Sequence, residues 1–579
     1  MSTKPQAIVP GAEPVPAISV EELSFTYHGS DRRALSGISF VQARGEAIGI
    51  IGASGVGKST LAKCLNRIIP EFEGGEFRGV VRIEGRPLDG TRVSEVAGTV
   101  GMVFQDFESQ LFSTNVAHEV AFAMEQIGMS REEMNLRIGP ALEAVGLAGF
   151  EARDPTTLSG GEKQRLAIAA VLALGPDLIV MDEPTTDLDP EGKAEVFALI
   201  RELRARGLSL LIIEHETDEL RACDRLMLMR DGEIIADAPP AALLTRLNLL
   251  EECGVHPPEL NHVLAAVGIA QHAPDVDHAE ALLRGLFPHL PRNVGSPPPS
   301  ASLRQAAAPE SAERPLVEIE DLSFSYPNGP RVIDSVSLSI RPGEFIAVIG
   351  QNGSGKTTLA KQIVGLLKPG VGRVLIEGRD RTPLMPAATA QQVGYVFQNP
   401  DHQIFAATVE DEVAFGPRNF GLAPEAIELR SAEVLSAVNL EGARDSDPFL
   451  LGKGERQRLA VASVLALRPR LLILDEPTTG LDYGEQRRMM KLVTELNGAG
   501  IAIAIITHTP WLVAAYARRV VLMRHGRLLF DGPVRDFFAD DELLRGSSFR
   551  APEVTALGRR FGVVALTAAE LVDWLRQYR

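Results

Sequence analysis

The sequence of 579 residues contains few cysteines and no long hydrophobic run. Its three cysteines, Cys64, Cys223 and Cys253, include no CxxC pair, which argues against a disulfide framework, a zinc ribbon or an iron–sulfur site. So few cysteines fit a protein of a reducing cytosol. No segment reaches the roughly 18 consecutive apolar residues that a membrane-spanning helix needs, so we expect no such helix.

The chain also lacks an excess of positive charge. It has 58 Lys and Arg residues against 76 Asp and Glu residues, which gives a formal net charge of −18. Nucleic-acid binding depends on basic residues that displace counterions from phosphates, so we expect no nucleic-acid partner. Hydrophobic residues at 45% and charged residues at 23% are typical of globular proteins and exclude a disordered, collagenous or coiled-coil chain.

The sequence consists of two similar halves. EAIGIIGASGVGKSTLAK in the first half reappears as EFIAVIGQNGSGKTTLAK in the second, and LIVMDEPTTDLD reappears as LLILDEPTTGLD. We expect one domain over residues 17–287 and another over 315–579, each with a C-terminal extension. Residues 288–314 are rich in Pro, Ser and Ala, which predicts a semi-extended linker. Residues 1–16 resemble no signal peptide and are expected to form a disordered arm.

Each half alternates short β-rich runs with longer helical patterns. This alternation predicts an α/β fold with a mostly parallel sheet flanked by helices. Each half also contains the pattern GxxxxGK[ST] between an apolar run and a helical one, a loop whose backbone N–H groups and lysine bind phosphates. The ATP-binding residues expected from these loops are Gly52, Ser54, Gly55, Gly57, Lys58, Ser59 and Thr60 in the first half, and Gly350, Asn352, Gly353, Gly355, Lys356, Thr357 and Thr358 in the second.

An acidic pair ends an apolar run in each half, and a histidine follows a later β-rich run. The Asp of such a pair can hold Mg²⁺ through water, and the Glu can polarise the attacking water. We therefore expect Glu183, Glu476, His215 and His508 to be catalytic, and Ser59, Asp182, Thr357 and Asp475 to hold the metal. ATP and Mg²⁺ are the expected cofactors.

The segment LSGGE at 158–162, followed by KQRLAIA, resembles the signature of ATP-binding-cassette (ABC) ATPases. All motifs of that family occur in order over residues 17–240 and 316–535. The resemblance implies two tandem P-loop ATPase domains, each with a helical signature subdomain, that form a head-to-tail sandwich around ATP. It further implies Q-loop and metal roles for Gln105 and Gln398, D-loop roles for Asp189 and Asp482, adenine stacking by Tyr27 and Tyr326, and ATP contacts from Ser159, Gly160, Gly161, Gly452 and Gly454.

The second half carries an altered signature, LGKGE, in which Gly452 replaces the serine and Lys453 replaces a glycine. In the head-to-tail arrangement that the resemblance implies, the ATP site of Glu476 faces Ser159, and the ATP site of Glu183 faces Gly452. We expect the Glu476 site to carry most of the turnover and the other site to act as an ATP-held clamp. The alternative is that the backbone N–H of Gly452 and the helix dipole suffice, so that both sites are equally active.

A Gln-apolar-Phe triplet follows each Q-loop glutamine, at 110–112 and 403–405, and an EVAF segment comes soon after. This pattern is similar to the ATPase subunits of energy-coupling-factor (ECF) importers. That resemblance implies a peripheral position on the cytoplasmic face of the membrane, a transmembrane T component docked beside the Q-loops, and a substrate-binding S component. We expect Phe112 and Phe405 to lie in or beside the docking grooves. By analogy alone, the cargo would be a vitamin, a precursor such as hydroxymethylpyrimidine or thiamine, or a transition-metal ion.

Two other functions remain open from the sequence. The ATPase of a monosaccharide importer is also a tandem chain, but it usually lacks the Gln-apolar-Phe and EVAF segment and usually has degraded motifs in its second half. A soluble, ribosome-associated ABC ATPase has a long, charged helical linker, whereas the join here is short and rich in proline.

Overall fold

The computed structural model describes residues 15–186, 188–291, 314–327, 329–381, 386–547 and 549–578. Residues 1–14 of the expected arm and 292–313 of the expected linker lie outside this part of the chain. The chain divides into two compact units, Met1–Pro257 and Pro258–Arg579, and each is described by itself. No helix within the described residues is both long enough and apolar enough to cross a membrane.

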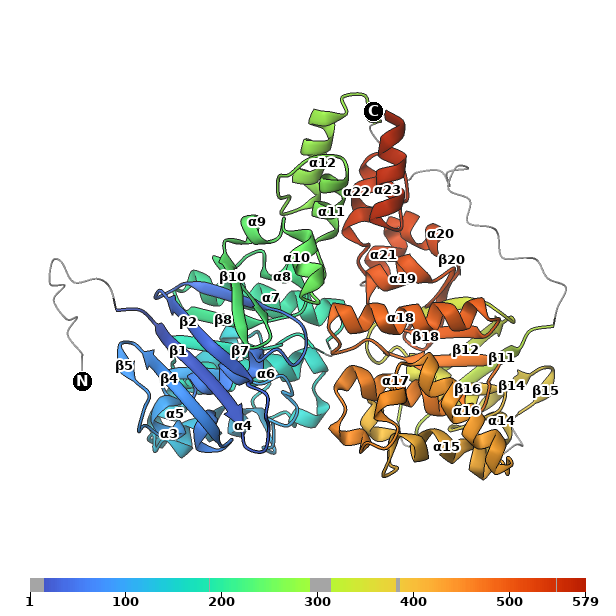
Figure 1. The fold of residues 1–579 in the computed structure, drawn as a ribbon, viewed down its shortest axis with the longest axis horizontal. Coiled ribbons are helices and arrows are strands. Elements are labelled where there is room, and N and C mark those ends of the chain that lie inside the picture. Colours follow the sequence, from blue (N-terminus) through green and yellow to red (C-terminus); the bar gives the residue numbers. More distant parts are fainter. Residues whose placement is uncertain are drawn as a thin grey trace. The chain divides into compact units, whose positions relative to one another are not determined.

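The first unit is built on a six-stranded sheet and a four-stranded antiparallel sheet (Figure 1). The larger sheet has the order β10-β9-β3-β8-β7-β6, and its strands are parallel except for β10. Its strands are β3 (Ala47–Ile51), β6 (Val100–Val103), β7 (Leu178–Asp182), β8 (Ser209–Ile213), β9 (Arg225–Arg230) and β10 (Glu233–Ala238). The smaller sheet contains β1 (Ile18–Tyr27), β2 (Leu35–Gln42), β4 (Gly75–Ile83) and β5 (Arg86–Pro87).

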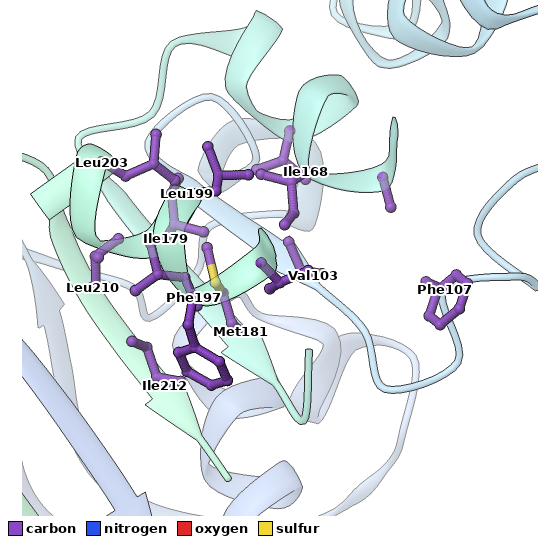
Figure 2. Packing of buried hydrophobic residues seen from close by; sticks show 14 of the residues in the cluster. Val103, Phe107, Ile168, Ile179, Met181, Phe197, Leu199, Leu203, Leu210 and Ile212 are labelled. Atoms are coloured by element: carbon purple, nitrogen blue, oxygen red, sulfur yellow. The ribbon is translucent and has the colours of Figure 1, made fainter. Parts of the chain in front are cut away.

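Strands β3, β7 and β8 are buried over their whole length because both faces of a parallel sheet are covered. Figure 2 shows one of these packed faces, where Ile179 and Met181 of β7 lie against Phe197 and Leu199 of α7. The helices of this unit are α1 (Lys58–Leu65), α2 (Ile68–Glu71), α3 (Val93–Val96), α4 (Val116–Gln126), α5 (Arg131–Ala144), α6 (Gly160–Leu174), α7 (Pro190–Ala205), α8 (Thr217–Leu220), α9 (Pro240–Leu243) and α10 (Leu247–Glu252), with a 3₁₀ turn at Pro155–Thr157.

The second unit repeats both sheets, in the orders β16-β17-β18-β13-β19-β20 and β12-β11-β14-β15. Its strands are β11 (Val317–Ser325), β12 (Arg331–Ile340), β13 (Phe345–Ile349), β14 (Val371–Ile376), β15 (Arg379–Asp380), β16 (Val393–Val396), β17 (Leu471–Asp475), β18 (Ala502–Ile506), β19 (Arg519–Arg524) and β20 (Arg527–Pro533). Its cassette helices are α13 (Lys356–Val364), α14 (Pro386–Thr389), α15 (Val409–Asn419), α16 (Pro424–Ala437), α17 (Lys453–Leu465), α18 (Tyr483–Gly498), α19 (Pro510–Tyr516), α20 (Val534–Ala539) and α21 (Asp541–Ser547), with 3₁₀ turns at Pro400–His402, Glu441–Ala443 and Pro448–Leu450. The mostly parallel α/β fold expected for each half is confirmed.

The second unit also contains a helical bundle made from the C-terminal extensions of both halves. Helices α11 (Glu259–Ala266) and α12 (Val276–Leu286) pack with α22 (Glu553–Arg560) and α23 (Ala568–Leu575) (Figure 1). The final 3₁₀ turn, Arg576–Tyr578, continues from α23. Glu259 accepts a hydrogen bond from the Val554 backbone at 3.1 Å, and Arg560 pairs with Asp277 at 2.7 Å. Because of this packing, residues 258–287 belong to the second compact unit, and the first unit ends at Pro257. The sequence repeat had assigned residues up to 287 to the first half.

Candidate ATP sites

The two phosphate-binding loops have the same geometry. Each joins the end of a buried strand, β3 or β13, to the first residue of a helix, Lys58 of α1 or Lys356 of α13. Gly57 has φ +103°, and a Cβ at this position would lie 2.3 Å from the Ala34 carbonyl oxygen, so only glycine fits. Lys58 Nζ donates to the carbonyl oxygens of Gly52 and Ala53 at 2.8 Å each. In the second loop, Lys356 Nζ donates to the carbonyl oxygens of Gly350 and Gln351 at 2.7 and 2.9 Å. Both buried ammonium groups therefore lie across the loop, where a phosphate would bind.

The aspartates of the acidic pairs end β7 and β17, and both are buried. Oδ1 of Asp182 and Oδ1 of Asp475 have no hydrogen-bond partner within the described residues, although both atoms are inaccessible to solvent. Burial raises the pKa of Asp182 to about 6 and also raises the pKa of Asp475. Hydroxyl groups of Ser59 and Thr357 lie within hydrogen-bond range of these carboxyls. A set of oxygen donors with an unused carboxylate oxygen fits a small hard cation such as Mg²⁺.

The glutamate of each pair contacts the histidine that the sequence singled out. His215 Nε2 lies 2.7 Å from Glu183 Oε1, and His508 Nδ1 lies 2.9 Å from Glu476 Oε1. Burial opposes ionisation of Glu183, but His215 and Lys58 hold the pKa of this carboxyl at about 2. The Glu183 side chain is therefore ionised near neutral pH, and its negative charge can polarise a water molecule by accepting a hydrogen bond from it.

The Q-loop of the first half reaches the same glutamate. Gln105 Nε2 donates to Glu183 Oε2 at 2.6 Å. Gln398 occupies the matching place two residues after β16, which ends at Val396. In the first unit, the structure thus brings together the phosphate loop, the acidic pair, the histidine and the Q-loop glutamine.

The two tyrosines expected at the adenine lie beside the start of the phosphate-loop helix. The Tyr27 hydroxyl lies 3.0 Å from Thr60 Oγ1, and the Tyr326 hydroxyl lies 3.3 Å from Thr358 Oγ1. Tyr326 is 41% exposed. Adenine stacking by these rings stays a prediction.

The two signatures begin their helices differently. Ser159 caps α6, because its hydroxyl accepts from the Glu162 backbone N–H at 3.3 Å while Glu162 Oε2 accepts from the Ser159 N–H at 2.7 Å. Gly452 keeps only the second of these bonds, at 2.8 Å to Glu455. Lys453 is exposed, and its ammonium lies against the α-carbon of Gly480, where a Cβ would be only 2.2 Å from Nζ. The D-loop aspartates, Asp189 and Asp482, cap α7 and α18 at 2.9 Å each.

The segment after each Q-loop glutamine is fixed by two side chains. Gln110 Oε1 accepts from the Phe104 backbone at 3.4 Å, and Glu119, which is buried, accepts from the Phe112 and Ser113 backbones at 3.0 and 2.7 Å. In the second unit, Gln403 Oε1 accepts from the Phe397 backbone N–H at 3.2 Å, and Glu412 accepts from the Phe405 and Ala406 backbone N–H groups at 3.0 and 2.9 Å.

Beside these hydrogen bonds, each cassette carries a pair of phenylalanines on its surface. Phe112 and Phe405 are each 60% exposed, and they pack edge-on against Phe122 and Phe415 at 4.4 and 4.6 Å between ring centres. The sequence reasoning named the first phenylalanine of each pair and missed the second. The EVAF segment could have indicated the second phenylalanine, because its E is the buried glutamate and its F is the second phenylalanine of the pair.

A buried glutamate next to the first histidine was also missed. Glu214 accepts from the Thr185 hydroxyl and backbone N–H at 2.8 and 3.2 Å, so it joins the start of the D-loop to the histidine. Burial raises the pKa of Glu214 to about 7. The second half has Thr507 at this place, and comparing IIEH with IITH reveals the difference.

Comparison with known proteins gives one family for both halves. The ABC transporter family model matches residues 35–186 and 333–479. The chain is 47% identical over 560 residues to the ABC transporter ATP-binding protein TTE1589 of Caldanaerobacter subterraneus subsp. tengcongensis, covering 96% of this chain and 98% of that protein. It is 40% identical over 582 residues to an ABC transporter ATP-binding protein of Methanosarcina acetivorans, covering 98% of this chain and 95% of that protein.

Among solved structures, cbiO1 from Clostridium perfringens, described as part of the ABC transporter complex cbiONQ, is 34% identical. The match covers 42% of this chain and 98% of that one, with a TM-score of 0.38. The family matches fall on both halves, and the relatives align over nearly the whole length. The chain therefore belongs to the ABC transporter family, as an ATPase with two ATP-binding cassettes.

Proposed function

We propose that this chain is the energy-coupling subunit of an ECF-type importer and lies on the cytoplasmic face of the membrane. The observation that carries the proposal is the exposed aromatic pair that each cassette holds beside its Q-loop. In each pair the first phenylalanine is 60% exposed and the second is 38% or 45% exposed, and such an apolar surface is costly in water and typical of a protein interface. The partner would be an apolar helix end of a transmembrane T component, which works with a substrate-binding S component.

The contacts of the first cassette connect this surface to the chemistry. Phe112 is bonded through its backbone to Glu119, and Gln110 is bonded to the Phe104 backbone. Gln105, which follows Phe104, donates to Glu183. A partner that displaces the aromatic pair therefore moves the catalytic carboxylate through a short, hydrogen-bonded segment.

Hydrolysis in each cassette uses the residues brought together in the site. When bound, Mg²⁺ would neutralise negative charge on the phosphates during hydrolysis. The side chains that would hold it are Ser59, Gln105 and Asp182 in the first cassette and Thr357, Gln398 and Asp475 in the second. The lysine orients the phosphates, the glutamate polarises the attacking water, and the histidine holds that glutamate in place.

The cargo follows only from the resemblance to ECF ATPases, which favours a vitamin, a vitamin precursor or a transition-metal ion. A monosaccharide importer is less well supported, because the second cassette retains Lys356, Asp475, Glu476 and His508 in the arrangement of the first.

The double variant Phe112→Asp, Phe405→Asp is expected to leave the membrane. Two new charges in an apolar interface would be desolvated without partners, so we expect the membrane-bound fraction to fall at least about tenfold. Sedimentation of membranes from cells that express each variant measures this fraction, and a fluorescent ATP analogue measures nucleotide binding, which should not change.

Phe72→Asp is the matched control, because Phe72 is 72% exposed and caps the C-terminal end of α2, which is not part of the Q-loop segment. It should remain with the membrane. Tight membrane association of the double variant, or equal release by the control, would contradict the proposed docking surface.

A further inference from the structure

The two cassettes differ at the strand that precedes the Q-loop. In the second cassette, the hydroxyl of Tyr395 in β16 donates to Oδ2 of Asp475 at 2.7 Å. The residue at the matching place in β6 of the first cassette is Met102, which is buried in the core. A methionine thioether cannot donate a hydrogen bond, so Asp182 lacks this contact.

The register of the sheet explains why the tyrosine reaches the carboxylate. Tyr395 lies directly opposite Ile473 in the parallel pair of β16 and β17. Asp475 is two residues further along β17, and residues two apart in a strand project from the same face. The ring also packs edge-on against Phe397 at 5.0 Å, which restricts its orientation.

The hydrogen bond from Tyr395 makes the two carboxylate oxygens of Asp475 different. Oδ2 accepts from the tyrosine, while Oδ1 is buried and has no hydrogen-bond partner within the described residues. Asp475 is 2% exposed, so water does not compete strongly for either oxygen. The bond to Tyr395 therefore fixes the orientation of the Asp475 carboxylate and leaves Oδ1 available. Groups that hydrogen-bond to metal ligands commonly orient those ligands in this way.

We infer that Tyr395 is a positioning residue for the Mg²⁺ ligand Asp475, and that the first cassette, with Met102 at the matching place, holds its aspartate without this contact. The inference rests on the proposed Mg²⁺ role of the aspartates and goes beyond it, because it assigns the two cassettes different metal affinities. The second cassette should bind Mg²⁺ with ATP at a lower Mg²⁺ concentration than the first.

The test is a Mg²⁺ titration of the binding of a fluorescent ATP analogue to the full chain. Lys58→Ala weakens the first site, so that the second dominates the signal. On this background, Tyr395→Phe removes only the hydroxyl and should raise the Mg²⁺ concentration for half-maximal binding by about tenfold. Nucleotide binding in EDTA and the thermal midpoint should not change. Met102→Tyr on a Lys356→Ala background is the reciprocal variant and should lower the Mg²⁺ requirement of the first site.

An unchanged Mg²⁺ requirement in Tyr395→Phe would overturn the inference. So would a lower thermal midpoint together with weaker binding in EDTA, because this result would assign the tyrosine to folding. If the parent chain shows no Mg²⁺ dependence at all, the proposed metal role fails instead, and the two failures are thus distinguishable.

Discussion

Replacing Glu476 by Gln is expected to reduce steady-state ATP hydrolysis about 100-fold, while Glu183→Gln leaves more than about half of it. The expectation rests on the head-to-tail arrangement that the resemblance to ABC ATPases implies, in which the Glu476 site would receive the intact signature with Ser159, and the Glu183 site would receive Gly452 and Lys453. The loss of one donor to developing charge costs about 2.7–4 kcal/mol, or a factor of about 10² to 10³ in rate. We take the lower figure, because Lys453 is an exposed residue and its positive charge would offset part of the loss.

The two variants should be assayed with the membrane partner present and at saturating ATP. Both keep the size of the side chain and remove only its charge, so both should still bind ATP, and this serves as the control. Equal losses from the two variants, or a larger loss from Glu183→Gln, would reject the asymmetry and favour two equally active sites.

Restoring the serine should rescue the weaker site. On the Glu476→Gln background, Gly452→Ser is expected to raise the residual turnover by up to about 100-fold, because the hydroxyl returns the missing donor. The serine fits, since Gly452 has φ −63° and ψ 158°, and an added Cβ would lie 3.4 Å from Glu455 Oε2. Replacing glycine by serine at a helix N-cap changes stability by only a few tenths of a kcal/mol, so a rise in turnover reports on the chemistry.

Gly452→Ala on the same background is the matched control, because it adds the Cβ without the hydroxyl. Its turnover should stay at the residual level. A rescue by alanine as large as that by serine, or no rescue by either, would show that the missing hydroxyl does not limit the first site.

The local parts of the site could be predicted from the sequence. The phosphate loops, the acidic pairs and the strands before them are encoded within a few adjacent residues, and the structure places them as expected. The contact of His215 with Glu183 was also foreseeable, because two parallel strands bring their carboxyl ends to the same edge of the sheet.

The contacts between distant segments could not be predicted in the same way. The bond from Tyr395 to Asp475 joins residues 80 positions apart and depends on the register of two strands. The bundle of α11, α12, α22 and α23 depends on tertiary packing, because short amphipathic helices show an apolar face without indicating what covers it. The sequence repeat therefore placed residues 258–287 with the first half, whereas these residues pack within the second compact unit.

The claim that this ATPase serves a membrane importer is tested most directly by what binds it in the cell. The full chain, carrying an affinity tag, would be purified from detergent-solubilised membranes, and the proteins that co-purify would be identified and quantified by mass spectrometry. We expect a stoichiometric integral membrane protein that is lost in the Phe112→Asp, Phe405→Asp variant. Recovery of the chain with ribosomes, and with no integral membrane protein, would contradict it.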